Sequence, residues 1–477
     1  MADVNDVDTL IDSFDVEPGY LDWARFGPLS PSVRTEMSAD AELLGTELLG
    51  TGRRAGIDLV GARAAEARTL VAKLLDVPGD EIVLQPSTTH GLLHAMFGLE
   101  GTVVVPAQDF PAVRLSAARA AAARGLLAVR EIDPPEGIVT TDAIVDALDD
   151  DVTAVALSLV DYRTGALVDL PAIREAIGDR LLIVDAIQAF GVVDVDWRAA
   201  DVITGNGYKW LRSGRGTGFA RFSPAARDRI EAVLSGISGM LGDAGTLGVP
   251  GVLPGAAAYS VAPSDPLAAS RLAAALRDID DVGVAPIAAA VRARAQEVMH
   301  LADRYEVPVM TPREAHAGIV TLLPAAADAS ALAAALANHG VTVTARGASI
   351  RVSAHVGTGA DSLLLLGDAL ADAASRRVSA VDFGGDPGGE ISAAEIITIE
   401  VIDAPPAPET RPEGDAWAEP ATGAVPEAET VSEIEAVPDD ALDAEAAVDD
   451  AVDAADDQIV IATIDDAAPD NDGRTEN

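Results

Sequence analysis

Apolar runs of two kinds alternate between residues 82 and 222. Short runs rich in Val, Ile and Leu predict buried strands, and Ala-rich stretches with a helical period, such as LPAIREAIG at 170–178, separate them. The strand-like runs are EIVLQP, GTVVVPA, TAVALSLV, LLIVDA, DVITG and GFARF. Because strands alternate with helices, we expect an α/β fold whose sheet is mostly parallel and covered on both faces.

The pattern changes after about residue 261. Long helices are predicted over Pro266–Ile279 and Ala285–Arg304, followed by HAGIVTLLP, a helix ending near Asn338, GVTVTAR and SIRVSAH. These elements predict a smaller α+β domain. The expected organisation is an N-terminal arm (1–20), a large domain (21–262), a small C-terminal domain (263–380) and a tail (381–477).

The tail has a composition of its own. It holds 28 acidic residues against two arginines and is rich in Ala and Pro, so it is predicted to be disordered. Two β-prone islands, EIITIEVID and DQIVIATID, resemble each other. They are either chance features of a biased linker or strands that add to the sheet edge of a partner protein.

Charge and composition narrow the function classes. Lys and Arg number 33 against 77 Asp and Glu, and the net charge of −44 disfavours binding to nucleic acid or to an anionic membrane. The chain has no cysteine, which excludes disulfides, thiolate metal sites and a thiol nucleophile. No metal ligand set is assigned. No apolar run approaches the roughly 18 residues that span a bilayer, and we expect a soluble cytoplasmic protein.

A phosphate site is predicted where the run ending at Pro86 meets a helical period. Ser87, Thr88 and Thr89 occupy the cap and first turn, where free backbone amides, hydroxyls and the helix dipole favour an anion. The alternative is an ordinary helix cap. No role is assigned to His90.

The segment Leu181–Phe222 carries the most specific chemistry. Asp185 ends an apolar strand, and the carboxyl end of a parallel strand faces the ligand crevice of an open sheet. Gln188 follows three residues later, and Lys209 lies between Tyr208 and Trp210, a mostly apolar setting that lowers the pKa of an amine. An acid, an amide and an amine in this order suit an aldehyde cofactor. The alternative for Asp185 is a helix cap.

This segment resembles the cofactor-anchoring stretch of pyridoxal-phosphate enzymes of the class V aminotransferase family. The resemblance extends over about residues 19–375. It implies fold type I, with a mostly parallel seven-stranded sheet in the large domain and a smaller α+β C-terminal domain. It also implies pyridoxal 5'-phosphate as cofactor, an amino acid as small-molecule substrate, and a homodimer in which the stretch near Ala262–Pro266 reaches the neighbouring site.

The resemblance also implies residue roles. Lys209 would hold the cofactor as an imine and Asp185 its ring nitrogen, while Arg351 in GASIRVSAHVGT would bind the substrate α-carboxylate. The remaining expected cofactor contacts are Gln188 to the ring oxygen, Thr88, Thr89, Asn206 and Tyr208 to the phosphate, and Phe110 stacked on the ring. The alternatives are a plain core position for Phe110 and an edge-strand role for Arg351.

These residues leave the reaction open among transamination, elimination and racemisation. Since no cysteine is present, a persulfide-forming desulfurase is excluded unless another protein supplies the thiol. GYKWLRSGRGTGFARFSP looks closest to actinobacterial carbon–sulfur lyases of ergothioneine synthesis, and kynureninases share the aromatic–lysine pairing. Arg212 and Arg215 would either meet a second substrate carboxylate or face solvent. A non-catalytic regulator whose acidic tail docks on a basic partner is the remaining alternative.

Overall fold

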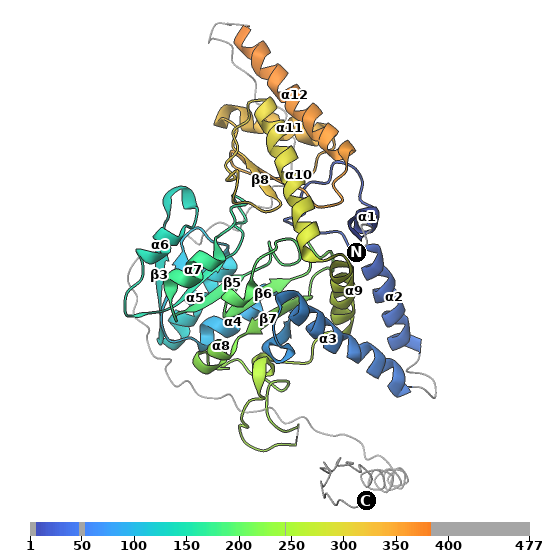
Figure 1. Cartoon of the computed structure of the whole chain (residues 1–477). Coiled ribbons are helices and arrows are strands. Elements are labelled where there is room, and N and C mark those ends of the chain that lie inside the picture. Colours follow the sequence, from blue (N-terminus) through green and yellow to red (C-terminus); the bar gives the residue numbers. More distant parts are fainter. Residues whose placement is uncertain (1–5, 47–52, 244, 383–477) are drawn as a thin grey trace, which may run out of the picture. The chain divides into compact units, whose positions relative to one another are not determined.

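A seven-stranded sheet is the centre of the larger part of the molecule (Figure 1). The computed structural model describes residues 6–46, 53–243 and 245–382. Strand order is β1-β7-β6-β5-β4-β2-β3, and the pairs from β6 to β3 are parallel, whereas β7 runs antiparallel to β6 and β1. This confirms the mostly parallel α/β sheet. The strands are β1 (Ile82–Gln85), β2 (Gly101–Pro106), β3 (Leu127–Ile132), β4 (Val152–Ser158), β5 (Leu181–Asp185), β6 (Val202–Asn206) and β7 (Gly218–Phe222).

Helices cover both faces of this sheet because its strands are apolar on both sides. Val103 and Val105 pack into one core with helices α4 and α5, whereas Val104, between them, packs into the opposite core with α3 and α7. The α-helices between residues 6 and 229 are α1 (Asp6–Asp12), α2 (Pro31–Thr46), α3 (Arg53–Leu75), α4 (Thr88–Gly98), α5 (Pro111–Arg124), α6 (Thr141–Val145), α7 (Leu170–Ile177) and α8 (Pro224–Arg229).

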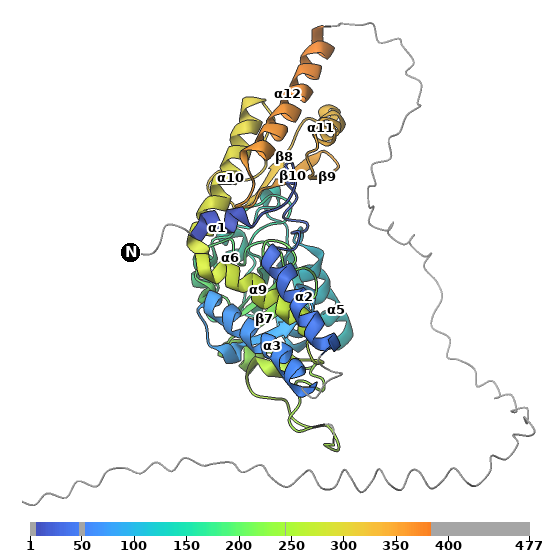
Figure 2. The same cartoon turned by 90° about the vertical axis from the view of Figure 1, so that its right-hand side faces the viewer.

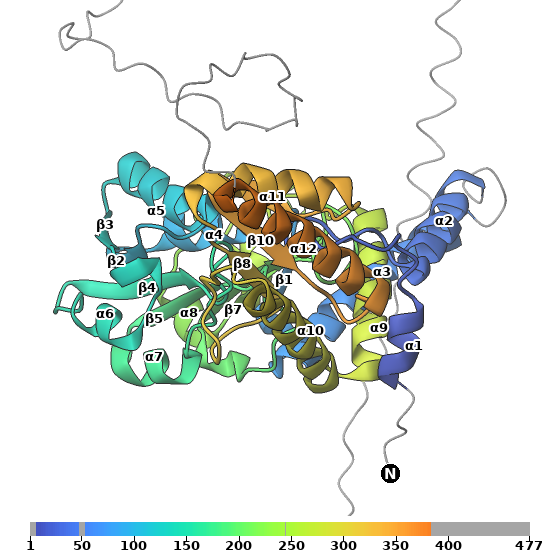
Figure 3. The same cartoon turned by 90° about the horizontal axis from the view of Figure 1, so that it is seen from above.

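A second, antiparallel sheet follows, in the order β8-β10-β9. Its strands are β8 (Ile319–Leu322), β9 (Thr344–Arg346) and β10 (Ser349–Ser353), and the helices of this part are α9 (Pro266–Val282), α10 (Val284–Arg304), α11 (Ala326–Asn338) and α12 (Ala360–Asp382). Figures 2 and 3 show α10 and α12 side by side over this sheet, around a third core that includes Val298, Ile350 and Leu366. Helix α9 packs instead on α2 and α3, and the domain boundary near residue 262 stays a prediction.

Strand β3 is not among the six runs that the apolar pattern indicates. It lies at the sheet edge, where only Leu127 of its six residues is buried. An edge strand with polar residues facing water lacks the continuous apolar run of a central parallel strand.

The N-terminal segment after α1 crosses between the two sheets. Asp22 forms a bridge with Ser353 at the end of β10, and the backbone N–H of Gly27 donates to the carbonyl of Tyr208 at 2.8 Å. One strip of chain therefore contacts both the small sheet and the turn that carries Lys209.

Predictions for the tail beyond residue 382, including both β-prone islands, lie outside the described residues. Among the helices that the structure does describe, none is long and apolar enough to cross a membrane.

Candidate active site

Lys209 lies in a buried aromatic setting. It follows β6 after the turn at Gly207 and Tyr208, and the residue is only 5% exposed. Its Nζ lies 5.7 Å from the centroid of the Phe110 ring and 5.6 Å from that of Tyr208. Burial lowers the pKa of the amine to about 7, opposed by the negative charge of Asp185. A lysine in this setting has a large neutral, nucleophilic fraction near pH 7.

Asp185 is the second buried charge of the site. It ends β5, is 2% exposed, and accepts a 2.9 Å hydrogen bond from the backbone N–H of Ile187. Burial raises the pKa of its carboxyl to about 7, and the nearby carboxyl of Asp109 acts in the same direction. Lys209 and the Ile187 N–H oppose the rise. A cationic partner bound above Asp185 would therefore be strongly favoured.

The turn after Lys209 is fixed by its own hydrogen bonds. Gly214 and Gly216 both adopt positive φ, as a tight turn before β7 requires. Thr217 Oγ1 donates to the carbonyl of Gly214 at 2.6 Å and lies 3.3 Å from Asn206 Oδ1, which also accepts from the backbone N–H of Tyr208. Asn206 therefore holds both ends of this turn together.

Helix α4 begins beside this turn. Ser87 caps the helix, and Asn206 Nδ2 donates to the carbonyl of Pro86 at 3.3 Å, which brings the helix N-terminus to the end of β6. The hydroxyl of Thr88 is buried without a hydrogen-bond partner in the described residues, while Thr89 is exposed. An unpartnered buried hydroxyl at a helix N-terminus suits an anionic ligand.

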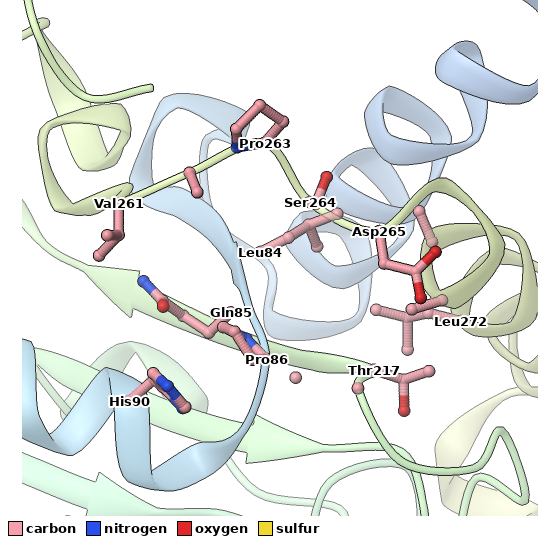
Figure 4. A pocket seen from close by; sticks show the side chains of 15 residues that line it. Leu84, Gln85, Pro86, His90, Thr217, Val261, Pro263, Ser264, Asp265 and Leu272 are labelled. Atoms are coloured by element: carbon pink, nitrogen blue, oxygen red, sulfur yellow. The ribbon is translucent and has the colours of Figure 1, made fainter. Parts of the chain in front are cut away.

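An apolar pocket of about 450 Å³ adjoins the start of α4 (Figure 4). His90 and Thr217 line one side, and the stretch from Val261 to Asp265 lines the other. Lys209 and Asp185 do not line it. His90 Nδ1 lies 2.9 Å from Ser87 Oγ, so this side chain takes part in the cap.

Gln188 has structural contacts of its own. Its Nε2 donates to the carbonyl of Ala24 at 3.1 Å, and its Oε1 accepts from Trp210 Nε1 at 2.8 Å. One amide N–H remains for another acceptor. The expected contact to the cofactor ring oxygen stays a prediction.

Arg351 extends from β10 into the space between the sheets. Its Nη1 donates to the carbonyl of Tyr162 at 3.0 Å, and its Nη2 contacts Asp22 Oδ1 at 3.4 Å and Thr344 Oγ1 at 3.3 Å. Its Nε is buried and has no partner among the described residues. The N-terminal segment thus orients the guanidinium while a further donor remains for a ligand.

Arg212 does not face Lys209. Its Cζ lies 3.9 Å from the centroid of the Phe14 ring, and its guanidinium donates to the carbonyls of Ser13 and Pro28 at 3.1 and 3.3 Å. It therefore joins the lysine turn to the N-terminal segment, a role that neither of the two sequence-based alternatives includes.

Sequence reasoning missed two carboxyls of this site, the buried Asp22 and the half-buried Asp109. Asp109 accepts from the backbone N–H and the hydroxyl of Ser158 at 2.7 and 2.6 Å, and burial raises its pKa. Both residues lie in loops, where hydrophobic periodicity carries no signal. Asp161, in the same part of the molecule, is paired with Arg163 at 2.8 Å.

The arrangement fits pyridoxal phosphate. A buried amine and a buried carboxyl suit an aldehyde and a protonated ring nitrogen, and the unpartnered Thr88 hydroxyl at the start of α4 suits a phosphate. The unpartnered Arg351 Nε suits a substrate carboxylate.

The chain is similar to known proteins. Residues 58–364 match the family model described as Aminotransferase class-V. The chain is 29% identical over 235 residues to the cysteine desulfurase IscS of Pseudomonas putida, which covers 46% of this chain and 57% of that protein. It is 30% identical over 256 residues to the kynureninase of Deinococcus radiodurans, covering 51% of this chain and 61% of that protein.

The chain thus spans little more than half the length of the curated relatives it matches. A solved structure with a similar fold is an apo cysteine desulfurase from Thermococcus onnurineus NA1. It has a TM-score of 0.67, is 19% identical, and covers 77% of this chain and 98% of its own.

Proposed function

Because the chain belongs to the class V aminotransferase family of pyridoxal-phosphate enzymes, we propose that it cleaves a carbon–sulfur bond in a cysteine-derived amino acid by β-elimination. The observation that carries the chemistry is the buried Lys209 amine, whose pKa burial lowers to about 7, beside the buried carboxyl of Asp185. Transamination of an amino acid is the other outcome that these residues support.

The chain's own residues divide the work. When bound, pyridoxal phosphate supplies an electron sink for the substrate α-carbon. Asp185 would keep a proton on the cofactor ring nitrogen, and Phe110 would cover one ring face. Lys209 removes the α-proton because burial lowers the pKa of its amine to about 7, so that a large fraction of the amine is neutral near pH 7. Arg351 orients the substrate through its α-carboxylate.

The other expected contacts belong to this proposal as well. Thr88, Thr89, Asn206 and Tyr208 would hold the phosphate, and Gln188 the ring oxygen. The structure supports the phosphate set through the position of Asn206 beside the start of α4. It supports the ring contact less directly, since the Gln188 amide already bridges Ala24 and Trp210.

The absence of cysteine from the sequence favours elimination over sulfur capture. Cysteine desulfurases of this family capture sulfur on an enzyme thiolate. This chain contains no cysteine, so sulfur would leave as a free thiol or on a thiol of another protein. A carbon–sulfur lyase of the ergothioneine-pathway type is the specific form that we propose, in the cytoplasm.

The chain offers a clean test because it has only two lysines, Lys73 and Lys209. The full-length protein is loaded with pyridoxal phosphate, reduced with borohydride and digested, and the modified peptide is identified by mass spectrometry. We expect the adduct on Lys209 and its loss in Lys209→Ala. Lys73→Ala is the matched control, because Lys73 is exposed and paired with Asp280 at 2.6 Å.

The reaction is then assigned with a substrate panel. S-alkylcysteines and their sulfoxides, cysteine, alanine and kynurenine are incubated with the loaded protein, and released pyruvate is separated from amino transfer to a keto acid. Pyruvate with a free thiol supports the lyase, and alanine or anthranilate from kynurenine would support the kynureninase-like alternative that the relative from Deinococcus radiodurans suggests. A protein that binds no cofactor would favour the regulator.

A homodimer is also proposed. The segment between β7 and α9 projects from the larger part of the molecule (Figure 1), and its apolar side chains are unusually open: Ile237 is 55% exposed, Leu247 94% and Val249 101%. Several exposed apolar side chains on one projecting segment are typical of a protein–protein contact. Light scattering on the full chain is expected to give twice the 48.8 kDa monomer mass, and Leu247→Asp with Val249→Asp is expected to shift it toward the monomer.

A further inference from the structure

The surroundings of Lys209 carry more positive charge than an α-carboxylate contact uses. Arg351 is buried and partly neutralised by Asp22 at 3.4 Å. Arg346 at the end of β9 and Arg215 in the turn after the lysine are exposed. Neither of these two makes an ion pair with a carboxylate of the described residues. All three arginines lower the pKa of Lys209, so their charges are felt at its amine.

Aromatic rings hold the two exposed guanidinium groups at the rim of the site. Arg346 Cζ lies 5.3 Å from the centroid of the Tyr162 ring, which is itself 5.1 Å from that of Phe110. Arg215 Cζ lies 4.6 Å from the centroid of the Tyr208 ring, and the lysine amine lies 5.6 Å from the same centroid. A guanidinium over a ring keeps its N–H edge available for a planar anion.

The positive charges of Arg346 and Arg215 at the rim contrast with the strongly negative net charge of the whole chain. The net charge of −44 creates a field that repels anionic substrates at long range. Local guanidinium groups that form no ion pair with a carboxylate of the described residues would overcome this repulsion at short range through charge-assisted hydrogen bonds. The site therefore offers binding for two anionic groups on one molecule, one at Arg351 and one at the rim.

We propose that Arg346, assisted by Arg215, binds a second anionic group at the distal end of the substrate, so that the substrates are amino acids with an anionic side chain. The inference rests on the proposed function, because it names the substrate class of the same site. A terminal carboxylate is the simplest such group, since a guanidinium binds it with two parallel hydrogen bonds.

Two isosteric substrates isolate the charge. S-carboxymethylcysteine and S-carbamoylmethylcysteine differ only in a distal carboxylate or amide, and each carries a sulfur leaving group. With the full-length loaded protein we expect kcat/KM to favour the carboxylate by about tenfold, the scale of one well-placed charge-assisted contact. Arg346→Gln should reduce this preference to about twofold or less through KM, and Arg346→Lys should restore part of it.

Arg119→Gln on α5, another exposed arginine, is the matched control and should leave the preference unchanged. Binding of the unreactive analogue 3-(carboxymethylthio)propionate, measured by calorimetry, gives a readout independent of turnover and should weaken in Arg346→Gln by the same factor. Equal efficiency with both substrates, or a preference that Arg346→Gln leaves intact, would overturn this inference alone. No turnover and no spectral change with any amino acid would overturn the proposed function together with it.

Discussion

At the scale of single residues, the Lys209 amine makes a testable pH prediction. Burial lowers its pKa to about 7 from an ordinary value of 10.5, so the amine is protonated below pH 7 and neutral above it. Only the neutral amine is nucleophilic, and the rate at which the apo protein captures pyridoxal phosphate should therefore rise with pH and level off above about pH 8. Stopped-flow absorbance between pH 5.5 and 10 measures this rate.

Asp185→Asn tests how much the Asp185 carboxylate raises the pKa of the Lys209 amine. The carboxylate of Asp185 raises the pKa of Lys209 against the effect of burial, so its removal should move the midpoint of the pH profile to lower pH. Lys73→Ala should leave the profile of the full chain unchanged, since Lys73 lies on the surface. A rate still rising at pH 10 would show that the amine is solvated and ordinary.

The sequence could indicate Lys209 and Asp185 because each follows a buried strand, and strand ends converge at one edge of a parallel sheet. The structure brings Phe110, Tyr208 and Asn206 to the same place. Asp22 and Asp109 could not be found in this way. Each is defined by a contact far away in the chain, Asp22 with Arg351 and Asp109 with Ser158, and no local pattern encodes such a pairing.

At the scale of elements, the N-terminal segment supports the lysine turn by direct backbone contact. A Cβ atom placed on Gly27 would lie 2.0 Å from the carbonyl oxygen of Lys209. Gly27→Ala must therefore displace the turn. We expect a loss of stability of about 1–3 kcal/mol, the usual cost of overpacking, together with faster release of the cofactor on dialysis, measured by thermal unfolding and by absorbance.

Gly61→Ala is the matched control for this change. Gly61 lies inside α3, and a Cβ atom placed on it would meet no other atom within 4 Å, so an added methyl group there should stabilise the helix by about 0.5–1 kcal/mol. If Gly27→Ala keeps the cofactor as firmly as the wild type, the contact between the N-terminal segment and the turn does not shape the site.

The apolar pattern of the sequence predicted the strands that are fully buried, and it missed a strand at the edge of the sheet. Central strands such as β5, buried at all five positions, read directly as apolar runs. Edge strand β3 did not, because most of its residues face water. Helix α9 was recognised, yet its packing on α2 and α3 was not, since an amphipathic period shows that a helix is covered without showing by what.

At the scale of the whole molecule, the acidic tail can be separated from catalysis. The family match ends at residue 364, and α12 closes the third core with Leu366 and Leu370. Truncation after residue 382 therefore removes nothing that the described core contains. We expect kcat and KM at 0.15 M salt to stay within about twofold of the full chain, because Lys209, Asp185, Arg351 and the side chains packed around them all precede residue 382.

Truncation after residue 359 is the contrasting variant. It removes α12 and with it the buried side chains of Leu366 and Leu370, each of which contributes roughly 2–5 kcal/mol when a core leucine is cut back to alanine. This protein should be insoluble or should unfold at a far lower temperature. If the cut after residue 382 instead lowers kcat several-fold while the thermal transition stays unchanged, the tail acts on the site itself, and the acidic segment belongs to the working enzyme.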